Sequence, residues 1–278
     1  MTVDVYGEAI KGEWKSTEAK PEARAETGLP ARVQPSGGTA EEAAATAPPE
    51  RTSVAGKTWV LVVTRDRPEL TRRTFEALFS STSAAFEAMV IDNGSQPETL
   101  HFLTGLLASG RISRLILNRD GTVPQWQKSY SIAQGFHLLA EEVCDYFAWL
   151  DNDIEVQPGW LETAVRILSS TNGQFPIVSL CNDAEQDRVH PVAKEMHIAG
   201  CPVKLKKTSN GALWVMKRSF FSKFGLPPIG MGITNMGVED WHYSRLMQQS
   251  RSFFAVVDGL ARHLGTEESA REKAYVKG

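Results

Sequence analysis

From residue 58 onward, short apolar runs alternate with longer segments whose apolar residues have helical spacing. The run Thr58–Thr64 (TWVLVVT) is continuously apolar and rich in β-branched residues, as in a strand buried on both faces of a parallel sheet. Three similar strands are expected at 88–91, 114–117 and 146–150. Helices are expected between them, one capped by Asp66, one over 97–108 and one over about 122–143. This alternation predicts a parallel α/β sheet with right-handed crossovers.

The second half of the chain has a less regular pattern. It predicts three more strands and three more helices, at 176–180, 212–216 and 253–257 and at 160–168, 218–224 and 238–249. A Gly/Met-rich loop spans 230–237, and the charged tail after Gly265 is expected to form a short exposed helix. By contrast, residues 15–56 are rich in Ala, Glu, Pro, Thr and Gly, a composition that predicts disorder.

Three polar residues, Asp92, Asn118 and Asp151, come directly after predicted strands. Parallel strands end at the same edge of a sheet, and ligands of α/β folds bind at that edge. We therefore expect these side chains to gather along one edge and to mark the site.

Composition narrows the class of protein. The 278 residues are 42% hydrophobic, which suffices for a sizeable core, and the net charge of −3 gives no global sign of nucleic-acid binding. No apolar stretch approaches the roughly 20 residues that span a bilayer, and the N-terminus lacks the apolar core of a signal peptide. Three cysteines without CxxC spacing argue against a disulfide framework or a zinc site. A cytoplasmic location is expected, in the host cytoplasm if a virus encodes the chain.

The sharpest local motif is Asp151-Asn152-Asp153. Two acids that flank one residue at a strand end can hold a hard divalent cation against diphosphate oxygens. Two solvated acids in a loop that caps a helix give the same pattern. His263, just after the last predicted strand, could complete a mixed oxygen and nitrogen coordination shell, although a lone histidine is commonly a surface or core residue.

A second acidic motif is Glu239-Asp240, preceded by a glycine-rich approach. One of these acids could take a proton from an attacking hydroxyl, or both could simply favour the helix dipole. Seven bases with a single acid, Glu195, lie between 194 and 223 and could contact phosphates or form a solvated face; the bases are Lys194, Lys204, Lys206, Lys207, Lys217, Arg218 and Lys223. The chain has neither a GxGxxG after the first strand nor a Walker A sequence.

Six motifs in the right order together resemble the large inverting glycosyltransferase family 2. They are VLVVTRDRPEL (60–70), VIDNGS (90–95), LDND (150–153) before Pro-Gly-Trp, GALWVMKR (211–218), VED (238–240) and His263. The resemblance covers about 58–265 and implies a GT-A fold, a Rossmann-like mixed and mainly parallel sheet flanked by helices. It also implies a nucleotide-sugar donor and a Mn²⁺ or Mg²⁺ ion.

The resemblance assigns roles residue by residue. Asp240 would be the catalytic base, and Glu239 would orient acceptor or donor sugar. The metal would be held by Asp151, Asp153 and His263. The donor would be bound by Thr64, Arg65, Asp92, Asn93, Lys128, Asp151 and Asn152. Where the family commonly has an aromatic residue and an asparagine after the first strand, this chain has Arg65 and Asp66, and Lys128 stands in a helix start that lacks the usual Ala-Arg-Asn.

The chain is expected to divide into a disordered tail at 1–56, a GT-A domain at 57–266 and a charged tail at 267–278. The domain would divide into a nucleotide-sugar half (57–180) and an acceptor half (181–266). The expected enzyme transfers a sugar, by preference from a UDP-sugar, to a hydroxyl with inversion. The acceptor would be a glycan or a hydroxylated DNA base, the latter because the basic stretch and the aromatics Trp214, Phe220 and Phe221 would suit phosphate contact and stacking of a flipped base.

Three other classes compete with this interpretation. A phosphatase with an Asp-x-Asp nucleophile requires that motif on its first strand and Thr or Val where this chain has Glu155. A sugar nucleotidyltransferase needs glycine in its first loop, and the loop here is Thr-Arg-Asp-Arg. A non-catalytic module that binds a nucleotide-sugar or glycan would show no turnover, which a donor hydrolysis assay separates.

Overall fold

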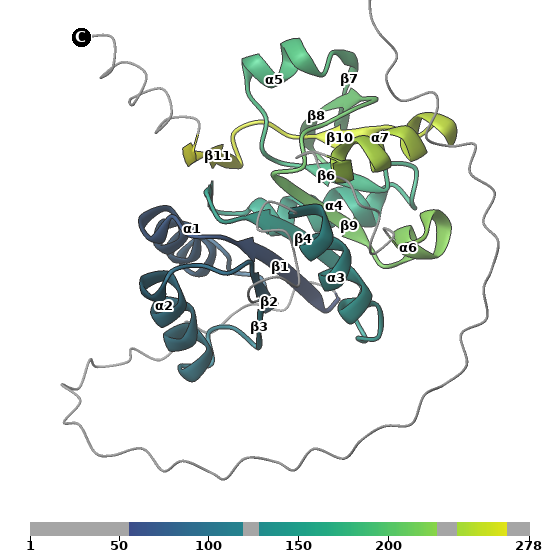
Figure 1. The fold of residues 1–278 in the computed structure, drawn as a ribbon. Coiled ribbons are helices and arrows are strands. Elements are labelled where there is room, and N and C mark those ends of the chain that lie inside the picture. The colour runs from purple at the N-terminus through teal and green to yellow at the C-terminus, as the bar shows by residue number, and fades with distance from the viewer. Residues whose placement is uncertain (1–55, 119–127, 227–237, 266–278) are drawn as a thin grey trace, which may run out of the picture. The chain divides into compact units, whose positions relative to one another are not determined.

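The computed structural model describes residues 56–118, 128–226 and 238–265. Their centre is a nine-stranded sheet in the order β3-β2-β1-β4-β9-β6-β10-β8-β7, beside a two-stranded ribbon of β11 and β5 (Figure 1). The strands are β1 (Thr58–Thr64), β2 (Glu87–Asp92), β3 (Arg114–Leu117), β4 (Tyr146–Asp151), β5 (Ile154–Val156), β6 (Ile177–Ser179), β7 (Val192–Ile198), β8 (Cys201–Lys206), β9 (Leu213–Lys217), β10 (Phe254–Val256) and β11 (Ala261–His263). The helices are α1 (Pro68–Ser80), α2 (Pro97–Ala108), α3 (Lys128–Ala140), α4 (Trp160–Ser170), α5 (Ala184–Val189), α6 (Ser219–Phe224) and α7 (Val238–Gln249).

The sheet is mixed, as the resemblance implies. Strands β3, β2, β1 and β4 run parallel, and β6 pairs in parallel with β10. Strand β9 lies antiparallel between β4 and β6, and the β7–β8 hairpin extends the sheet beyond β10. The predicted α/β class with a mixed sheet flanked by helices is therefore confirmed, and the four strands from which a parallel arrangement was expected, β1 to β4, are parallel.

Alternate residues of the strands feed two cores, one on each face of the sheet. On one face, Val60 and Val62 of β1 pack with α1, α2 and α4. On the other, Leu61 packs with α3, α6 and α7. Helix α3 lies so close to β1 that a Cβ at Gly135 would come within 2.5 Å of the Leu61 side chain. A glycine at this position lets α3 pack onto the sheet.

Several expected boundaries are reproduced closely, and the differences have physical causes. The hairpin of β7 and β8 was not expected, because β7 is largely exposed and carries a register shift, so it shows no alternating pattern. The ribbon of β5 and β11 and the six-residue α5 are too short for a periodic signal. Asp66 does not cap α1: Arg67 precedes the helix, in a left-handed conformation and without a side-chain cap bond.

Some expectations lie outside the described residues. They are the disordered segment before residue 56, the start of the third helix before Lys128, the loop over 230–237 and the tail after Gly265. Among the residues that are described, no helix is long and apolar enough to cross a bilayer.

Candidate functional site

The end of β2 forms a buried polar cluster around Asp92, which is 1% exposed. One carboxylate oxygen accepts hydrogen bonds from the Thr64 hydroxyl (2.9 Å) and the Ser95 hydroxyl, and the other accepts from the backbone N–H groups of Gly94 (3.1 Å) and Ser95 (2.9 Å). Both oxygens are therefore saturated by neutral donors of the protein itself. Asp92 holds the β1 and β2 ends together and fixes the turn after β2.

Asn93 and Asn118 extend this cluster to β3 and α3. The Asn93 side-chain oxygen accepts from Ser131 (2.5 Å) and from the Asn118 amide (3.1 Å), and that amide also donates to Gln134 (2.9 Å). The Asn118 backbone N–H donates to the Asp92 carbonyl. The predicted convergence of Asp92 and Asn118 at one sheet edge is thus present, with Asn93 buried between them.

The turn after β1 joins three strand ends. Asp66 and Arg67 both have positive φ, 48° and 53°. Around Asp66, the Ser95 hydroxyl accepts from its backbone N–H (2.7 Å), its carboxylate accepts from the Gln96 N–H (2.7 Å), and its carbonyl accepts from the Thr71 hydroxyl (3.0 Å). These bonds hold a left-handed conformation that costs roughly 1–3 kcal/mol per non-glycine residue. Arg65, just before this turn, is half-buried.

At the end of β4, Asp151 pairs with a cation from α3. The Lys128 ammonium lies 2.6 Å from the Asp151 carboxylate and 3.5 Å from the Gly211 carbonyl, over the face of the Trp149 ring. The Asn152 amide donates to the Thr71 hydroxyl (2.8 Å), which ties the loop after β4 to α1. Lys128 and Asp151, predicted as donor contacts, therefore meet in one ion pair, and Asn152 holds the loop in place.

Asp153 is buried, with its side chain 7% exposed, and Arg67 is its main partner. The Arg67 guanidinium lies 2.7 Å from one carboxylate oxygen, and His263 Nε2 lies 3.8 Å from the other. Strand β11 brings His263 here because it pairs antiparallel with β5, which puts His263 opposite Ile154. A Cβ at Gly265 would overlap the Asp153 carboxylate, so glycine is required for this close approach.

Asp153 and His263 fit a divalent cation by chemistry and by spacing. A carboxylate oxygen and an imidazole nitrogen are both ligands of Mn²⁺-like ions, and two ligands at about 2.1 Å from one ion can be up to roughly 4 Å apart. Asp151 is held by Lys128, and within the described ranges no group of three or more His, Cys, Asp or Glu side chains is close enough to hold a metal. The predicted three-residue metal set is therefore brought together only in part, as the Asp153–His263 pair.

The predicted base lies at the start of α7. Glu239 and Asp240 belong to the first turn of this helix, and the positions of their side chains lie outside what the structure describes. One turn further on, burial lowers the pKa of His242, with Arg245 adding to the effect. Tyr243 is fully buried in the aromatic cluster with Trp214 and Phe220, its hydroxyl has no hydrogen-bond partner among the described residues, and burial raises its pKa.

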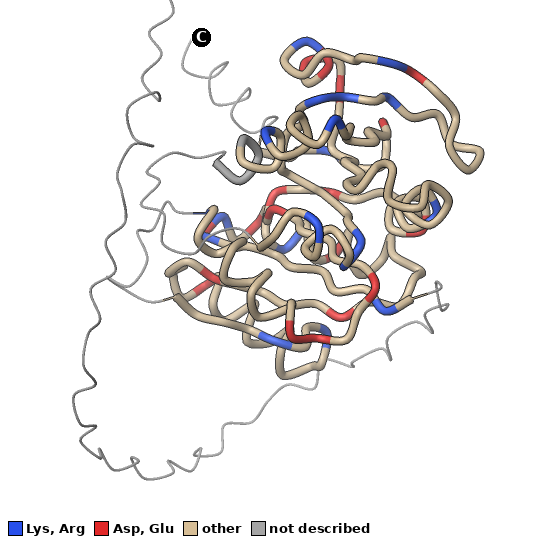
Figure 2. Tube along the Cα trace, turned by 90° about the vertical axis from the view of Figure 1, so that its right-hand side faces the viewer, with Lys and Arg blue, Asp and Glu red and all other residues tan. Residues whose placement is uncertain are grey.

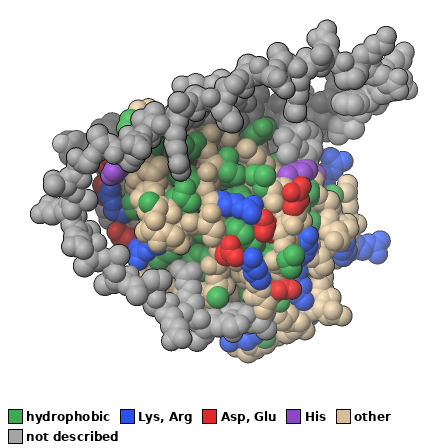
Figure 3. Space-filling view, turned by 90° about the horizontal axis from the view of Figure 1, so that it is seen from below, with side chains coloured by type: hydrophobic (Ala, Val, Ile, Leu, Met, Phe, Trp, Pro, Cys, Tyr) green, Lys and Arg blue, Asp and Glu red, His purple; other side chains and the backbone are tan. Residues whose placement is uncertain are grey.

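Several features expected to suit a DNA acceptor make contacts within the protein itself. Phe221 is half-buried and packs against Phe136 and Phe147. Trp214 is fully buried and Phe220 is 2% exposed, so neither can stack on a flipped base. Lys204 and Lys206 both pair with Asp187, and the Arg218 guanidinium donates to the carbonyls of residues 140 and 142. Basic and acidic residues are both spread over the chain trace (Figure 2), and the face drawn in Figure 3 shows side chains of both signs side by side. The basic stretch thus does not form a continuous basic face in the described residues.

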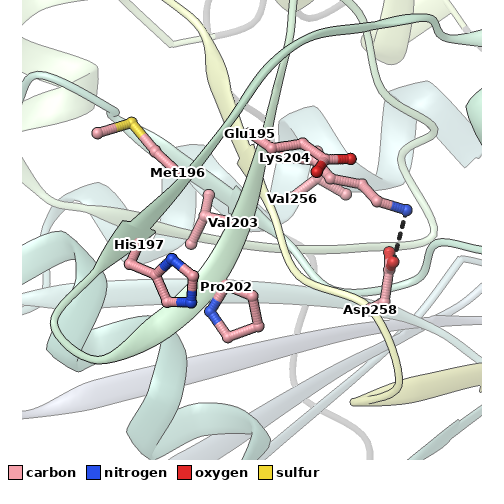
Figure 4. A pocket seen from close by; sticks show the side chains of 8 residues that line it. All are labelled: Glu195, Met196, His197, Pro202, Val203, Lys204, Val256 and Asp258. Carbon is pink, nitrogen blue, oxygen red and sulfur yellow. Dashed lines mark ion pairs between the residues drawn. The ribbon is translucent and has the colours of Figure 1, made fainter.

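One cavity of about 340 Å³ lies on the far part of the sheet, between the β7–β8 hairpin and the end of β10. Val203, Pro202 and Val256 give it apolar walls, and Lys204 and Asp258 meet across it in an ion pair of 2.6 Å (Figure 4). None of the predicted site residues lines it. The cavity is therefore separate from the strand ends that carry Asp92 and Asp153.

Comparison with known proteins connects this geometry with a family. Residues 59–191, which hold the β1, β2 and β4 ends, match the model of Glycosyl transferase family 2. The chain resembles glycosyltransferase family 2. The match contains Asp92, Asp151 and Asp153 and ends before α7 and β11, which carry Asp240 and His263. No curated protein sequence matches the chain significantly.

Solved structures of glycosyltransferases share the fold. One, described as GalNAc-T7 with UDP, GalNAc and Mn²⁺, is 15% identical with a TM-score of 0.50 over 74% of this chain and 43% of its own. Another is the mannosyltransferase PcManGT from Pyrobaculum calidifontis in complex with GDP-Man and Mn²⁺, 15% identical with a TM-score of 0.51 over 79% of this chain and 59% of its own. At this identity the likeness establishes the GT-A fold alone, and the chain spans less than two thirds of either structure.

Sequence reasoning missed Arg67 and Gly265, which both touch Asp153. Arg67 stands among three charged residues of an exposed turn, and only the left-handed backbone turns it toward the loop after β4. Gly265 comes two residues after His263. A glycine next to a predicted metal ligand was the available signal, because such a glycine indicates a close approach of backbone to the site.

Proposed function

We propose that this chain is a metal-dependent glycosyltransferase that moves a sugar from a nucleotide-sugar, preferably a UDP-sugar, to a hydroxyl acceptor with inversion. One observation carries the proposal. The buried Asp153 after β4 lies beside His263 of β11, within a GT-A fold whose first half matches the family 2 model.

In this proposal the donor lies across the carboxyl ends of β1, β2 and β4. The nucleoside lies against the β1 and β2 ends, where Arg65 stands at the rim. Thr64, Asp92 and Asn93 form the rigid floor, since their side-chain hydrogen bonds are made within the protein. These buried hydrogen bonds give the floor a fixed shape that need not rearrange when the nucleoside binds.

The diphosphate lies toward the β4 end. Asp153 and His263 hold the cation there, and the cation neutralises charge on the leaving diphosphate. Asp151 stands next to them and keeps Lys128 at the site, 2.6 Å away. The ammonium of Lys128 is a compact charge on a flexible stem, so it can turn from the Asp151 carboxylate to a phosphate oxygen when the donor binds.

The acceptor hydroxyl is activated from α7. A hydroxyl is a poor nucleophile until its proton is removed, and a carboxylate within about 3 Å contributes roughly 10²- to 10⁴-fold. Glu239 and Asp240 are consecutive in a helix, so their side chains diverge by about 100° and cannot both face one atom. We assign the base to Asp240 and acceptor or sugar orientation to Glu239.

A glycan hydroxyl is the acceptor that the described residues favour. Of the side chains that would support a DNA base, Lys204 and Lys206 are ion-paired and Trp214 and Phe220 are buried. A non-catalytic glycan-binding module is the competing function, and it predicts donor binding without turnover.

Donor hydrolysis tests the proposal. The full chain is incubated with UDP-, GDP- and TDP-sugars and Mn²⁺, with and without chelator, and free sugar is measured. We expect turnover with one donor class, highest for a UDP-sugar, lost in chelator and restored by Mn²⁺ or Mg²⁺. Asp240→Asn keeps shape but cannot accept the proton, so transfer to an added acceptor should fall at least about 10²-fold while donor affinity stays near wild type.

Two outcomes would contradict the proposal. Cation-dependent donor binding with no hydrolysis or transfer at all would favour the binding module. A product that keeps the anomeric configuration of the donor would remove the inverting mechanism and with it the role of Asp240.

A further inference from the structure

Asp153 is a buried acid with a half-exposed cationic partner. Its side chain is 7% exposed, whereas that of Arg67 is 53% exposed, and the two join at 2.7 Å. His263 also approaches the carboxylate, but at 3.8 Å it is too far for a hydrogen bond. In the described part of the chain, Arg67 therefore supplies the positive charge that a buried carboxylate requires.

The position of Arg67 is built into the fold. Asp66 and Arg67 are two consecutive left-handed residues, and neither is glycine. The hydrogen bonds of Asp66 with Ser95, Gln96 and Thr71 fix this turn to the β2 end and to α1. A strained turn that the surrounding structure holds at a site commonly serves the function of that site. Here the turn places the Arg67 guanidinium next to the Asp153 carboxylate.

The backbone closes the other side of the pair. A Cβ at Gly265 would overlap the Asp153 carboxylate and lie 3.1 Å from the same Arg67 nitrogen that binds it. His263 approaches the second carboxylate oxygen from β11. Arg67, His263 and Gly265 thus surround Asp153, and a cation that gains full use of this carboxylate has to compete with the guanidinium.

We propose that Arg67 is the resident counter-ion of Asp153, which a divalent cation displaces and which then binds the donor diphosphate. This inference rests on the proposed function, because it requires cation and diphosphate at Asp153. The guanidinium of a half-exposed arginine can leave its partner without unfolding its own element, and its planar fork matches phosphate oxygens. Cation and diphosphate binding are then coupled, since each favours the state in which Arg67 has left Asp153.

Mn²⁺ binding in the absence of any nucleotide tests the competition directly. Mn²⁺ is titrated with the full chain of the wild type, Arg67→Gln or Arg67→Lys, and electron paramagnetic resonance measures the Mn²⁺ that stays free. The dissociation constant of each protein follows from this titration. Arg67→Gln removes the competing charge and should bind Mn²⁺ about tenfold more tightly, a change of the size expected for one charge a few ångströms away in a largely screened site. Arg67→Lys keeps the charge and should stay near wild type.

Arg73→Gln is the matched control. Arg73 also forms an ion pair with a carboxylate of the same ribbon, 2.9 Å from Glu155, so this variant removes an equal charge nearby without touching Asp153. Its Mn²⁺ affinity should stay within about twofold of wild type. A gain as large as that of Arg67→Gln would reduce the effect to general electrostatics and overturn the inference.

Adding UDP or GDP tests the coupling. Nucleoside diphosphate should raise the Mn²⁺ affinity of both proteins, and the increase should be about tenfold larger in the wild type than in Arg67→Gln, because only the wild type must release Arg67.

Thermal melting in chelator gives a readout free of nucleotide. Arg67→Gln should melt below wild type, and Mn²⁺ should recover more of the melting temperature in the variant than in the wild type.

The outcomes separate this inference from the proposed function. If Mn²⁺ binds the wild type and not Asp153→Asn, but Arg67→Gln binds it equally or more weakly, Arg67 is not a competitor and the inference fails while the metal site stands. If neither the wild type nor Arg67→Gln binds Mn²⁺ through Asp153, with or without UDP or GDP, both the inference and the metal-dependent function fail.

Discussion

Two buried aspartates, Asp92 and Asp153, lie at or just after the ends of the two strands that flank β1, and they are held in opposite ways. Asp92 after β2 is 1% exposed and accepts hydrogen bonds from hydroxyls and backbone N–H groups. Asp153 after β4 is nearly as buried, and its close partner is the guanidinium of Arg67. Neutral donors within the same turns cannot leave without disturbing the fold, whereas a half-exposed cation can be exchanged for another cation. We propose that these partners distinguish a scaffold carboxylate, Asp92, from a ligand-binding one, Asp153.

Strands β2 and β4 both end in an aspartate, and they end at the same edge of the sheet, on either side of β1. Asp92 is the last residue of β2, and Asp151 is the last residue of β4, in adjacent registers along β1. The difference comes from the segment after each strand. The turn after β2 folds back on its own aspartate, while the loop after β4 meets α1, α3 and β11.

Removing the scaffold carboxylate should have the largest effect on stability. Asp92→Ala leaves the buried hydroxyls of Thr64 and Ser95 and two backbone N–H groups without their acceptor. We expect the free energy of unfolding to fall by about 3 kcal/mol, measured by urea denaturation. Asp92→Asn, which keeps one acceptor, should lose less. A stable Asp92→Ala variant that has lost only nucleotide binding would break the comparison.

A side chain at Gly265 should disturb the exchangeable carboxylate without touching the scaffold one. Gly265→Ala pushes on Asp153, and overpacking at a buried site costs about 1–3 kcal/mol. Mn²⁺-dependent nucleotide binding should weaken about tenfold, measured by calorimetry. Gly105→Ala is the control: this glycine lies in α2 with open space around it, so its replacement should leave binding unchanged. Equal affinity in both variants would contradict the packing around Asp153.

Tyr243 offers a third kind of buried polar group, one without a partner among the described residues. Its hydroxyl is fully buried and unbonded there, and burial raises the pKa of the side chain. Tyr243→Phe should raise the free energy of unfolding by up to about 1 kcal/mol, because it removes an uncompensated desolvation cost. Thermal melting checks this, and a loss of stability would mean that the hydroxyl has a partner in the protein in solution.

The smallest effect is expected from removing residues 1–54. Every contact described around Asp92 and Asp153 is made by residues after 56. Lys57 is already tied to the domain, because its backbone N–H donates to Asp145 and its ammonium pairs with Glu87. A chain that begins at Ala55 should therefore keep its melting temperature within a few degrees and keep donor hydrolysis. Failure to fold would show that the N-terminal segment packs on the domain.

Much of the parallel half could be predicted from the sequence, because β1, β2 and β4 are largely buried on both faces and form apolar runs, whereas β3 is partly exposed. Thr58–Thr64 is the clearest, with all seven residues buried. In the second half, β6, β9, β10, α4, α6 and α7 were also predicted to within two residues at each end. The β7–β8 hairpin was missed, because β7 exposes most of its side chains and pairs through a register shift. Strand β8 does pack alternate residues, Cys201, Val203 and Leu205, into the core, and its Lys204 and Lys206 pair with Asp187 of α5.

The sequence predicted which acidic residues lie at the candidate site, but it did not predict which basic residue pairs with each of them. The spacing of Asp151 and Asp153 and the later His263 predicted a metal site at the β4 end, and the structure brings His263 to Asp153 while Asp151 pairs with Lys128. The pairing of each acid could not be predicted, since Lys128 and Arg67 come from separate segments and reach their carboxylates only through the turns of α3 and β1. Motif spacing indicates chemistry, whereas counter-ions come from tertiary structure.

The central claim is that Asp153, and not Asp92, binds the donor through a divalent cation. Calorimetric titration of UDP and GDP into the full chain, with and without Mn²⁺, tests it most directly when repeated with Asp153→Asn. The account predicts that nucleotide binding by the wild type depends on Mn²⁺ and that Asp153→Asn binds no more tightly with Mn²⁺ than without it. Mn²⁺-enhanced binding of equal strength in Asp153→Asn would contradict the account.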